Sequence, residues 1–256
     1  MALDNQFLLI LISGLFTALA ASLLGAFIVV KRMALVGDVL SHVALPGIGL
    51  ALMLSIDPIY GAAVFLLAAA FGTWLIEKKT ALPPEAIIGT FFTATLALGV
   101  LLVPNEELFE SLFGNLFAIK KLDAVIIIAA SSMIFFLTLL LSRRLTLSIA
   151  APDLSKSAGF RPDFSYLAFL LLFALSVALG IKLIGSVLMG ALTILPAVSA
   201  RNFAWSLKSF LVFSIIFGFI MTFIGILISA VFNFPPGPAV ILTGIIFFII
   251  SLFFKK

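Results

Sequence analysis

The chain has 256 residues, of which 64% are hydrophobic and only 10% are charged, and its mean hydropathy is +1.36. A soluble domain of this length needs far more polar surface to cover its core, so the composition excludes a water-soluble fold. The net charge of +4 comes from small basic clusters at the ends of apolar runs, such as Lys31-Arg32 and Arg143-Arg144. That placement is typical of a membrane protein and gives no reason to expect a nucleic-acid partner. The absence of cysteine excludes disulfides and thiolate metal ligands.

The apolar runs predict an all-α, polytopic transmembrane helical bundle of eight or nine spans, with residues 1–256 forming one domain. A span needs about 20 residues to cross the hydrocarbon core, and no run alternates at period two as a barrel strand would. The first run follows a segment without Lys or Arg, so we interpret it as a retained span rather than a cleaved signal peptide. The predicted spans are 7–30, 35–54, 59–76, 86–103, 124–141, 166–181, 183–200, 210–232 and 239–254.

The basic clusters place the N-terminus outside and the C-terminus inside the cell membrane, with Lys120, Lys121 and Lys182 as exceptions on the outer side. Residues 108–119 are apolar but too short to span, which predicts a re-entrant or interfacial helix. The acidic patch Glu106, Glu107 and Glu110 precedes or overlaps this segment. It would attract cations or a basic partner surface, although a solvated loop is the simpler interpretation.

The longest polar stretch, residues 142–164, falls on the cytoplasmic side by its charge. Pro152 followed by Asp153 predicts the start of a short helix, and Gly159 predicts its end. A short helix below the membrane is either a docking surface for a motor subunit or an ordinary loop helix. The sequence leaves both interpretations open.

The second predicted span carries two ionisable residues four positions apart, Asp38 and His42, which therefore share one helix face. Counted from Met33, His42 lies roughly 14 Å into the membrane. Ionisable groups at that depth are costly unless they pair or face water, and they mark a pathway by default. The alternative is that the two side chains only hydrogen-bond each other and hold helices together.

Pro46 and Gly47 follow this pair. A proline has no N–H, so the carbonyl of His42 loses its usual helical partner. Imidazole, carboxylate and carbonyl together are plausible ligands for zinc or manganese. In a later span Pro196 is predicted to kink the helix in the same way, although tight packing of its small residues explains that stretch equally well.

Two long motifs resemble the permeases of bacterial and archaeal zinc/manganese ABC importers. They are residues 33–47 (MALVGDVLSHVALPG) and residues 185–201 (GSVLMGALTILPAVSAR). The resemblance covers nearly the whole chain. It implies a type II-like importer permease that works as a dimer with a second copy of itself, two copies of a cytoplasmic ABC ATPase and an extracytoplasmic metal-binding protein.

The resemblance also assigns roles to residues. It places Asp38 and His42 as ligands of the transported ion, Zn²⁺ or Mn²⁺. The proline and glycine chemistry predicts helix breaks or a gate at Pro46, Gly47 and Pro196. The resemblance implies that a segment near residues 147–163 contacts the ATPase. The contact residues are Pro152, Asp153, Leu154, Lys156, Gly159 and Arg161.

The chain has no phosphate-binding Gly-x-x-x-x-Gly-Lys-Ser/Thr loop, so we expect a transport subunit with no covalently bound cofactor, and ATP use by the partner. Two other functions stay open from the residues alone. One is a gradient-driven secondary transporter with Asp38 and His42 as a proton relay, and the other is an ABC permease for a siderophore, haem or cobalamin. Among ions, the stretch 196–204 is similar to zinc importers and favours zinc over manganese.

Overall fold

The structure is a computed structural model, and it describes residues 5–33, 36–80, 82–102, 120–232 and 234–254. Within these ranges the chain is helical and contains no strand. The helices are α1 (Asn5–Val30), α2 (Val36–Val43), α3 (Leu45–Met53), α4 (Pro58–Thr80), α5 (Pro84–Leu102), α7 (Lys121–Ala150), α8 (Pro152–Ser157), α9 (Pro162–Ile184), α10 (Ser186–Arg201), α11 (Leu207–Phe232) and α12 (Pro236–Leu252).

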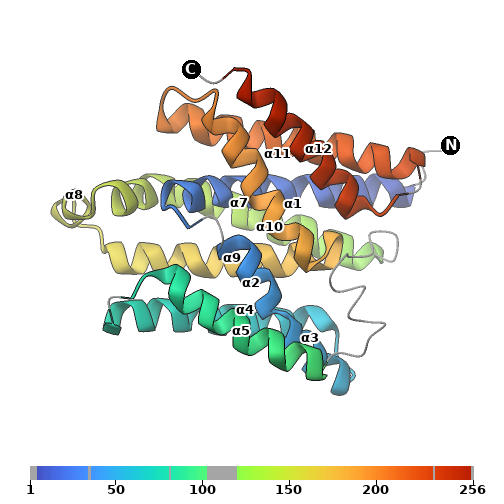
Figure 1. The fold of residues 1–256 in the computed structure, drawn as a ribbon, viewed down its shortest axis with the longest axis horizontal. Helices are drawn as coiled ribbons and strands as arrows, with labels where there is room; N and C mark the ends of the chain where they lie inside the picture. Colours follow the sequence, from blue (N-terminus) through green and yellow to red (C-terminus); the bar gives the residue numbers. More distant parts are fainter. Residues whose placement is uncertain (1–4, 34–35, 81, 103–119, 233, 255–256) are drawn as a thin grey trace.

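The predicted helical bundle is confirmed. Among the described residues, seven segments are long and apolar enough to cross a membrane, one of them made of α2 and α3 together, and α10 and α12 are shorter apolar helices. The long helices run roughly parallel, and the two termini lie at opposite ends of the bundle (Figure 1). The predicted helix over 108–119 and the acidic patch at 106–110 lie outside the described residues.

The charged residues gather at the two ends of the bundle. One end contains Lys31, which lies 3.9 Å from Glu77, and Lys78, which lies 3.8 Å from Asp163. The same end carries α8 (Figure 1), and we refer to it as the inner end because the basic clusters lie there. The opposite end, which carries Lys182, is the outer end.

Helix α7 is longer than the sequence predicted. The predicted span ended at 141, before Arg143 and Arg144, but α7 continues through both arginines to Ala150. Its 30 residues measure roughly 45 Å, against a hydrocarbon core of about 30 Å. The extension is helical because Leu145 is buried again beyond the arginines, at 1% exposure. Helix α7 therefore projects out of the bundle at the inner end and carries α8 at its tip.

The core lies around α1 and α9. Helix α9 is the most buried span, with 72% of its span window inside the protein. Phe169 and Phe173 of α9 stack with ring centroids 6.3 Å apart, and Phe27 of α1 meets Phe169 edge-on at 6.4 Å. In contrast, the spans α4, α5 and α7 bury less than a third of their windows, so they form the periphery of the protomer.

Candidate functional site

The second predicted span is interrupted at one residue, Ala44, whose backbone keeps helical angles (φ −68°, ψ −27°). Helix α2 ends at Val43, Ala44 forms the junction, and α3 begins at Leu45. Pro46 lies in the first turn of α3. The N–H groups of a first turn have no partner within the helix, so the missing N–H of a proline costs no hydrogen bond there. The same proline cannot donate to the carbonyl of His42. The sequence predicted this break, and the structure shows that it divides the span into two short helices.

The two halves make close glycine contacts with different helices, although both also pack on α4 and α5. On α2, Gly37 lies against Phe173 of α9 and Gly190 of α10. On α3, Gly47 faces Gly61 of α4 so closely that a Cβ on either would overlap the carbonyl of the other. Gly47 is therefore a packing residue that joins α3 to α4.

Asp38 lies at a close approach between α2 and α10. A Cβ built on Gly190 would lie 2.7 Å from the Cα of Asp38, so only glycine permits this helix separation. The carboxylate itself points out of the protomer, because Asp38 is exposed while Gly37, Leu40 and Ser41 around it are buried. The sequence could not reveal this role of Gly190, since a small residue in an apolar helix has many explanations.

His42 lies one turn further along α2 and is half-buried. Its ring meets Phe92 of α5 edge-on, with centroids 5.4 Å apart, and its Nδ1 is buried without a hydrogen-bond partner. No hydrogen bond joins His42 to Asp38 in the described part of the chain. The alternative in which the pair only bind each other is therefore not what this structure shows, and one buried ring nitrogen of His42 has no hydrogen-bond partner.

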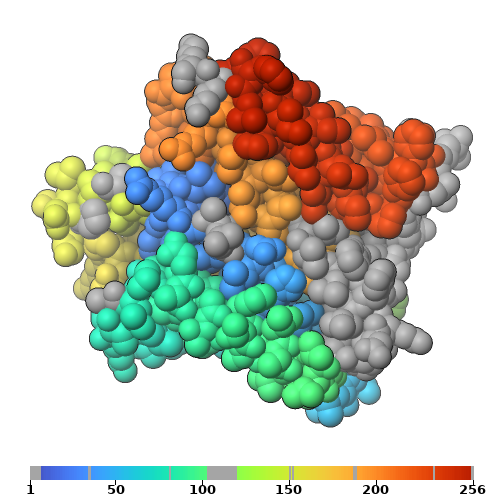
Figure 2. Space-filling model, in the orientation of Figure 1, coloured from blue at the N-terminus to red at the C-terminus, as the bar shows by residue number. Residues whose placement is uncertain are grey.

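Asp38 and His42 alone do not amount to a complete metal site within one protomer. Among the described residues no three His, Asp or Glu side chains come together in an arrangement that would hold an ion. Helix α2 reaches the surface between α5 and α10, near the middle of the long axis of the bundle (Figure 2). A carboxylate exposed at that depth cannot face lipid at acceptable cost, so it faces water or a second protein surface.

Pro196 lies inside α10, is buried, and does not interrupt the helix, which runs unbroken from Ser186 to Arg201. The break in this part of the chain is at Gly185 instead, whose φ of 87° ends α9 and starts α10. The predicted span 183–200 is therefore corrected: α10 begins after this glycine. Only glycine adopts such a backbone conformation without strain.

The predicted short cytoplasmic helix is present as α8. Pro152 is its first residue, Asp153 lies in its first turn, and Gly159 has a φ of 77°. The N–H of Phe160 bonds to the carbonyl of Ser155, and the N–H of Gly159 to that of Lys156, both at 3.0 Å. These two bonds define a Schellman motif, the usual glycine-terminated helix end.

Helix α8 presents its polar and apolar side chains outward. Asp153, Lys156 and Arg161 are exposed, and Leu154 is 63% exposed although it lies beyond the membrane-spanning part of α7. The helix is held to α7 through Ser155, which is buried and lies 3.2 Å from the hydroxyl of Ser148. These exposed side chains of α8 are therefore accessible to another protein at the inner end.

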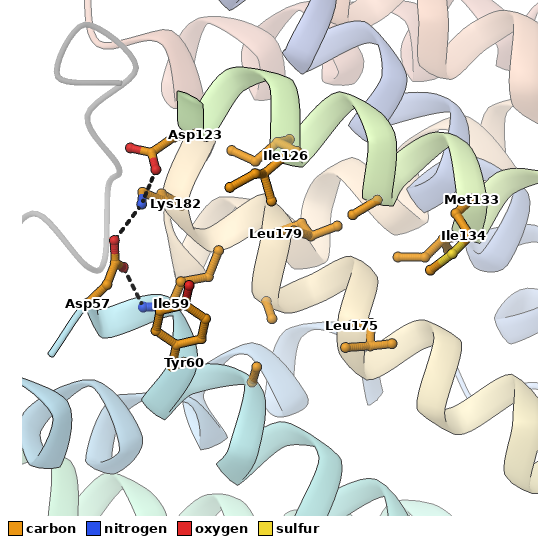
Figure 3. Close-up of a pocket in the computed structure, with 14 residues that line it drawn as sticks. Asp57, Ile59, Tyr60, Asp123, Ile126, Met133, Ile134, Leu175, Leu179 and Lys182 are labelled. Atoms are coloured by element: carbon orange, nitrogen blue, oxygen red, sulfur yellow. Dashed lines mark hydrogen bonds and ion pairs between the residues drawn. The ribbon is translucent and has the colours of Figure 1, made fainter. Parts of the chain in front are cut away.

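The sequence missed a triad of charged residues at the outer end. The amine of Lys182, at the end of α9, lies 2.9 Å from Asp57 before α4 and 3.3 Å from Asp123 on α7 (Figure 3). Burial raises the pKa of Asp57, but the N–H of Ile59 and the amine of Lys182 outweigh this and bring it below its usual range. The only sequence signal was that Lys182 violates the charge rule, and its partners are far away in the chain.

Residues 4–255 match the ABC 3 transport family. The chain belongs to this family. A manganese import system permease protein, ScaB of Streptococcus parasanguinis, is 34% identical to this protein over 248 residues, which cover 95% of this protein and 88% of ScaB. A high-affinity zinc uptake system membrane protein, ZnuB of Haemophilus influenzae, is 31% identical over 256 residues and 96% of each chain.

Among solved structures, PsaBC from Streptococcus pneumoniae in complex with Fab superposes with a TM-score of 0.85. It is 30% identical in sequence, and the match covers 97% of this protein and 91% of the matched chain of PsaBC. This protein is therefore a multi-pass permease of the cell membrane with the architecture of an ABC importer. The resemblance inferred from the two long motifs is confirmed.

Proposed function

We propose that this chain is the permease of an ATP-driven importer for a divalent metal ion, and that Asp38 and His42 contact the ion in transit. The single observation that carries the proposal is the exposed carboxylate of Asp38 beside an unpartnered Nδ1 of His42 in the middle of the bundle. The names of the relatives support a metal ion as the substrate, because they include both a manganese and a zinc transport protein.

The same observation supports a dimer. One protomer offers one imidazole and one carboxylate, while Zn²⁺ in proteins normally takes four ligands. Two copies that meet along the α2 face would supply two such pairs, and water or the carbonyl of His42 would complete a larger shell for Mn²⁺. A site shared in this way releases its ion when the copies separate, which suits a gate better than a storage site.

The coupling to ATP is assigned to α8. The exposed residues Asp153, Leu154, Lys156 and Arg161 form the surface that we propose for the ATPase. Pro152 and Gly159 delimit this surface by starting and ending the helix. A metal-binding protein is proposed to deliver the ion at the outer end. Membership of an ABC family disfavours the gradient-driven alternative, and the relatives named for manganese and zinc disfavour a bulky chelate.

Zinc rather than manganese is the proposed ion, and the donor set does not decide between them. Imidazole suits zinc and carboxylate suits manganese. The preference rests on the stretch 196–204, and the metals named for the two relatives differ. Half-maximal stimulation of ATPase activity at a lower free concentration of zinc than of manganese is the expected result. The reverse order would overturn the zinc preference and leave the pathway proposal intact.

The pathway is tested with Asp38→Ala and His42→Ala in the reconstituted importer complex. Each variant removes one of the two proposed ligands. Loss of a group that only supports a metal ligand costs about 10- to 100-fold in metal affinity, so we expect metal uptake and metal-stimulated ATPase activity to fall at least about tenfold.

Glu85→Gln is the control because it removes an exposed carboxylate in the first turn of α5, close enough to act on Lys31 at the inner end of the bundle. All three variants should co-purify with the ATPase, which separates a lost ligand from a lost fold. Normal uptake in both Asp38→Ala and His42→Ala would show that the pathway lies elsewhere.

A further inference from the structure

A groove lies at the outer half of the protomer between α4, α7 and α9 (Figure 3). It has a volume of about 250 Å³. Its walls are apolar and include Ala63, Ala130, Met133, Ala178 and Leu179, while the charged triad Asp57, Asp123 and Lys182 lies at one end. The transport mechanism proposed above uses none of these residues.

The groove opens sideways, toward the surroundings of the protomer. Tyr60, Ile126 and Met133 line it and are 64%, 48% and 55% exposed. Two of its three helices, α4 and α7, are peripheral spans. An apolar cavity does not retain water, and at this depth of the membrane the available apolar occupant is a lipid chain.

The length of the groove matches one membrane leaflet. It extends along α7 from Asp123 to Ile134, which is roughly 16 Å at 1.5 Å per residue. Half of a hydrocarbon core of about 30 Å is about 15 Å. The charged triad therefore lies at headgroup depth when the apolar walls lie at acyl-chain depth.

The charges at the mouth are mixed. Lys182 is one cation held between two carboxylates, and the positive charge of Lys120 also acts on Asp57. A headgroup that carries both an ammonium and a phosphate complements such a mouth: the ammonium faces Asp57 and Asp123, and the phosphate faces the lysines. A headgroup with only a negative charge has no ammonium to place against Asp57 and Asp123, so it would be repelled by these two carboxylates.

We propose that this groove is a binding site for one phospholipid of the outer leaflet, with an acyl chain between α4 and α7 and a phosphatidylethanolamine-type headgroup on the charged triad. A second copy of the chain is not the expected occupant, because α7 packs on α1 and α9, whereas the exposed α2 packs on α10 and α5. The site is independent of the transported ion, so its test does not depend on the proposed function.

Native mass spectrometry of the full chain tests the site after mild delipidation and readdition of phosphatidylethanolamine. The wild type is expected to retain one lipid per protomer. Ala130→Leu places a larger side chain in the groove and should lower that occupancy at least about fivefold. Ala129→Leu makes the same substitution on the exposed neighbouring residue, outside the groove, and should retain the lipid.

A second pair protects the test against misfolding. Ala63→Leu enlarges a residue that lines the groove from α4. Ala68→Leu makes the same change at an exposed residue of α4 that does not line the groove. Competition between phosphatidylethanolamine and phosphatidylglycerol tests the mouth: Asp57→Asn combined with Asp123→Asn should shift binding toward phosphatidylglycerol. Equal lipid occupancy in both filling variants and their controls would overturn the site. A dimer that forms in lipid-free detergent and covers the groove with a second copy would also overturn it.

Discussion

Lys31 and Asp38 lie seven residues apart and have opposite surroundings. The side chain of Lys31 is only 23% exposed and its amine lies 2.9 Å from the centroid of the Tyr166 ring, whereas Asp38 is exposed at the surface of the protomer. Tyr166 also donates its hydroxyl to the sulfur of Met33 at 3.9 Å. These contacts hold Lys31 and Met33, which follow α1, against the start of α9.

Burial of Lys31 predicts a pH dependence of stability. Burial lowers its pKa to about 8, although Glu77 and Glu85 act to raise it. An unfolded lysine keeps its proton to a pH of about 10.4. Between these values the unfolded state binds more protons, so stability must rise with pH. We therefore expect the thermal midpoint of the wild type to rise relative to that of Lys31→Met as the pH increases from about 8 to about 10, because the buried amine then loses its charge in the folded state.

The control for this prediction is Lys79→Met, which removes an exposed lysine from the same end of the bundle. Its thermal midpoint should follow that of the wild type from pH 7 to pH 10. The comparison needs only thermal unfolding in detergent at each pH. A constant difference between Lys31→Met and the wild type across this range would contradict the assignment.

At the scale of helices, the contact between α2 and α10 leads to a second prediction. Gly190→Ala adds a Cβ 2.7 Å from the Cα of Asp38, and the obstacle is backbone, so the helices have to separate. Overpacking of this kind costs about 1–3 kcal/mol. We expect a lower thermal midpoint and reduced metal uptake, because α2 is displaced at the proposed ligand itself.

Gly89→Ala is the matched control. A Cβ on Gly89 would meet nothing within 4 Å, and alanine favours the helix over glycine by about 1 kcal/mol. Its stability and metal uptake should therefore equal or exceed those of the wild type. If Gly190→Ala behaved like Gly89→Ala, the close approach of α2 and α10 would not exist in the working protein.

The projecting helix α8 leads to a third prediction. Leu154→Asp places a charge at the centre of the proposed ATPase contact, where Leu154 is 63% exposed. A buried anchor residue of an interface contributes about 2 kcal/mol or more, which corresponds to roughly 30-fold weaker binding. We expect this loss of affinity for the ATPase in a pull-down titration.

Leu82→Asp serves as the comparison, since Leu82 is another exposed leucine, in the connection between α4 and α5. It should leave binding of the ATPase unchanged. Equal binding by Leu154→Asp and the wild type would show that α8 is an ordinary loop helix, the alternative that the sequence left open.

At the scale of the whole molecule, the orientation in the membrane is directly testable because the chain has no cysteine of its own. Ser157→Cys lies exposed on α8, and Lys120→Cys lies exposed before α7. In intact cells an impermeant maleimide should label Lys120→Cys and not Ser157→Cys, and inside-out vesicles should give the opposite result. Labelling of Ser157→Cys from outside the cell would invert the topology and remove α8 from reach of a cytoplasmic ATPase.

The fold class, the spans and the two ends of the bundle follow from the sequence alone. Their physical cause is local: backbone groups in lipid must bond within a helix, and apolar length and flanking charge are properties of short segments. The break before Pro46 and the glycine end of α8 were predictable for the same reason, since proline and glycine act on their own turns. The candidate residues Asp38 and His42 stood out because ionisable groups in an apolar span are costly.

Only the tertiary structure decided how those residues are used. Exposure of Asp38, the free Nδ1 of His42 beside Phe92, and the contact of Gly190 with α2 depend on helices that are distant in the chain. The same holds for Lys182 between Asp57 and Asp123 and for the groove below them. In a membrane, almost every helix face is apolar, so the sequence pattern does not reveal which faces meet. Packing decides it, through small residues and close approaches that appear only when the helices are assembled.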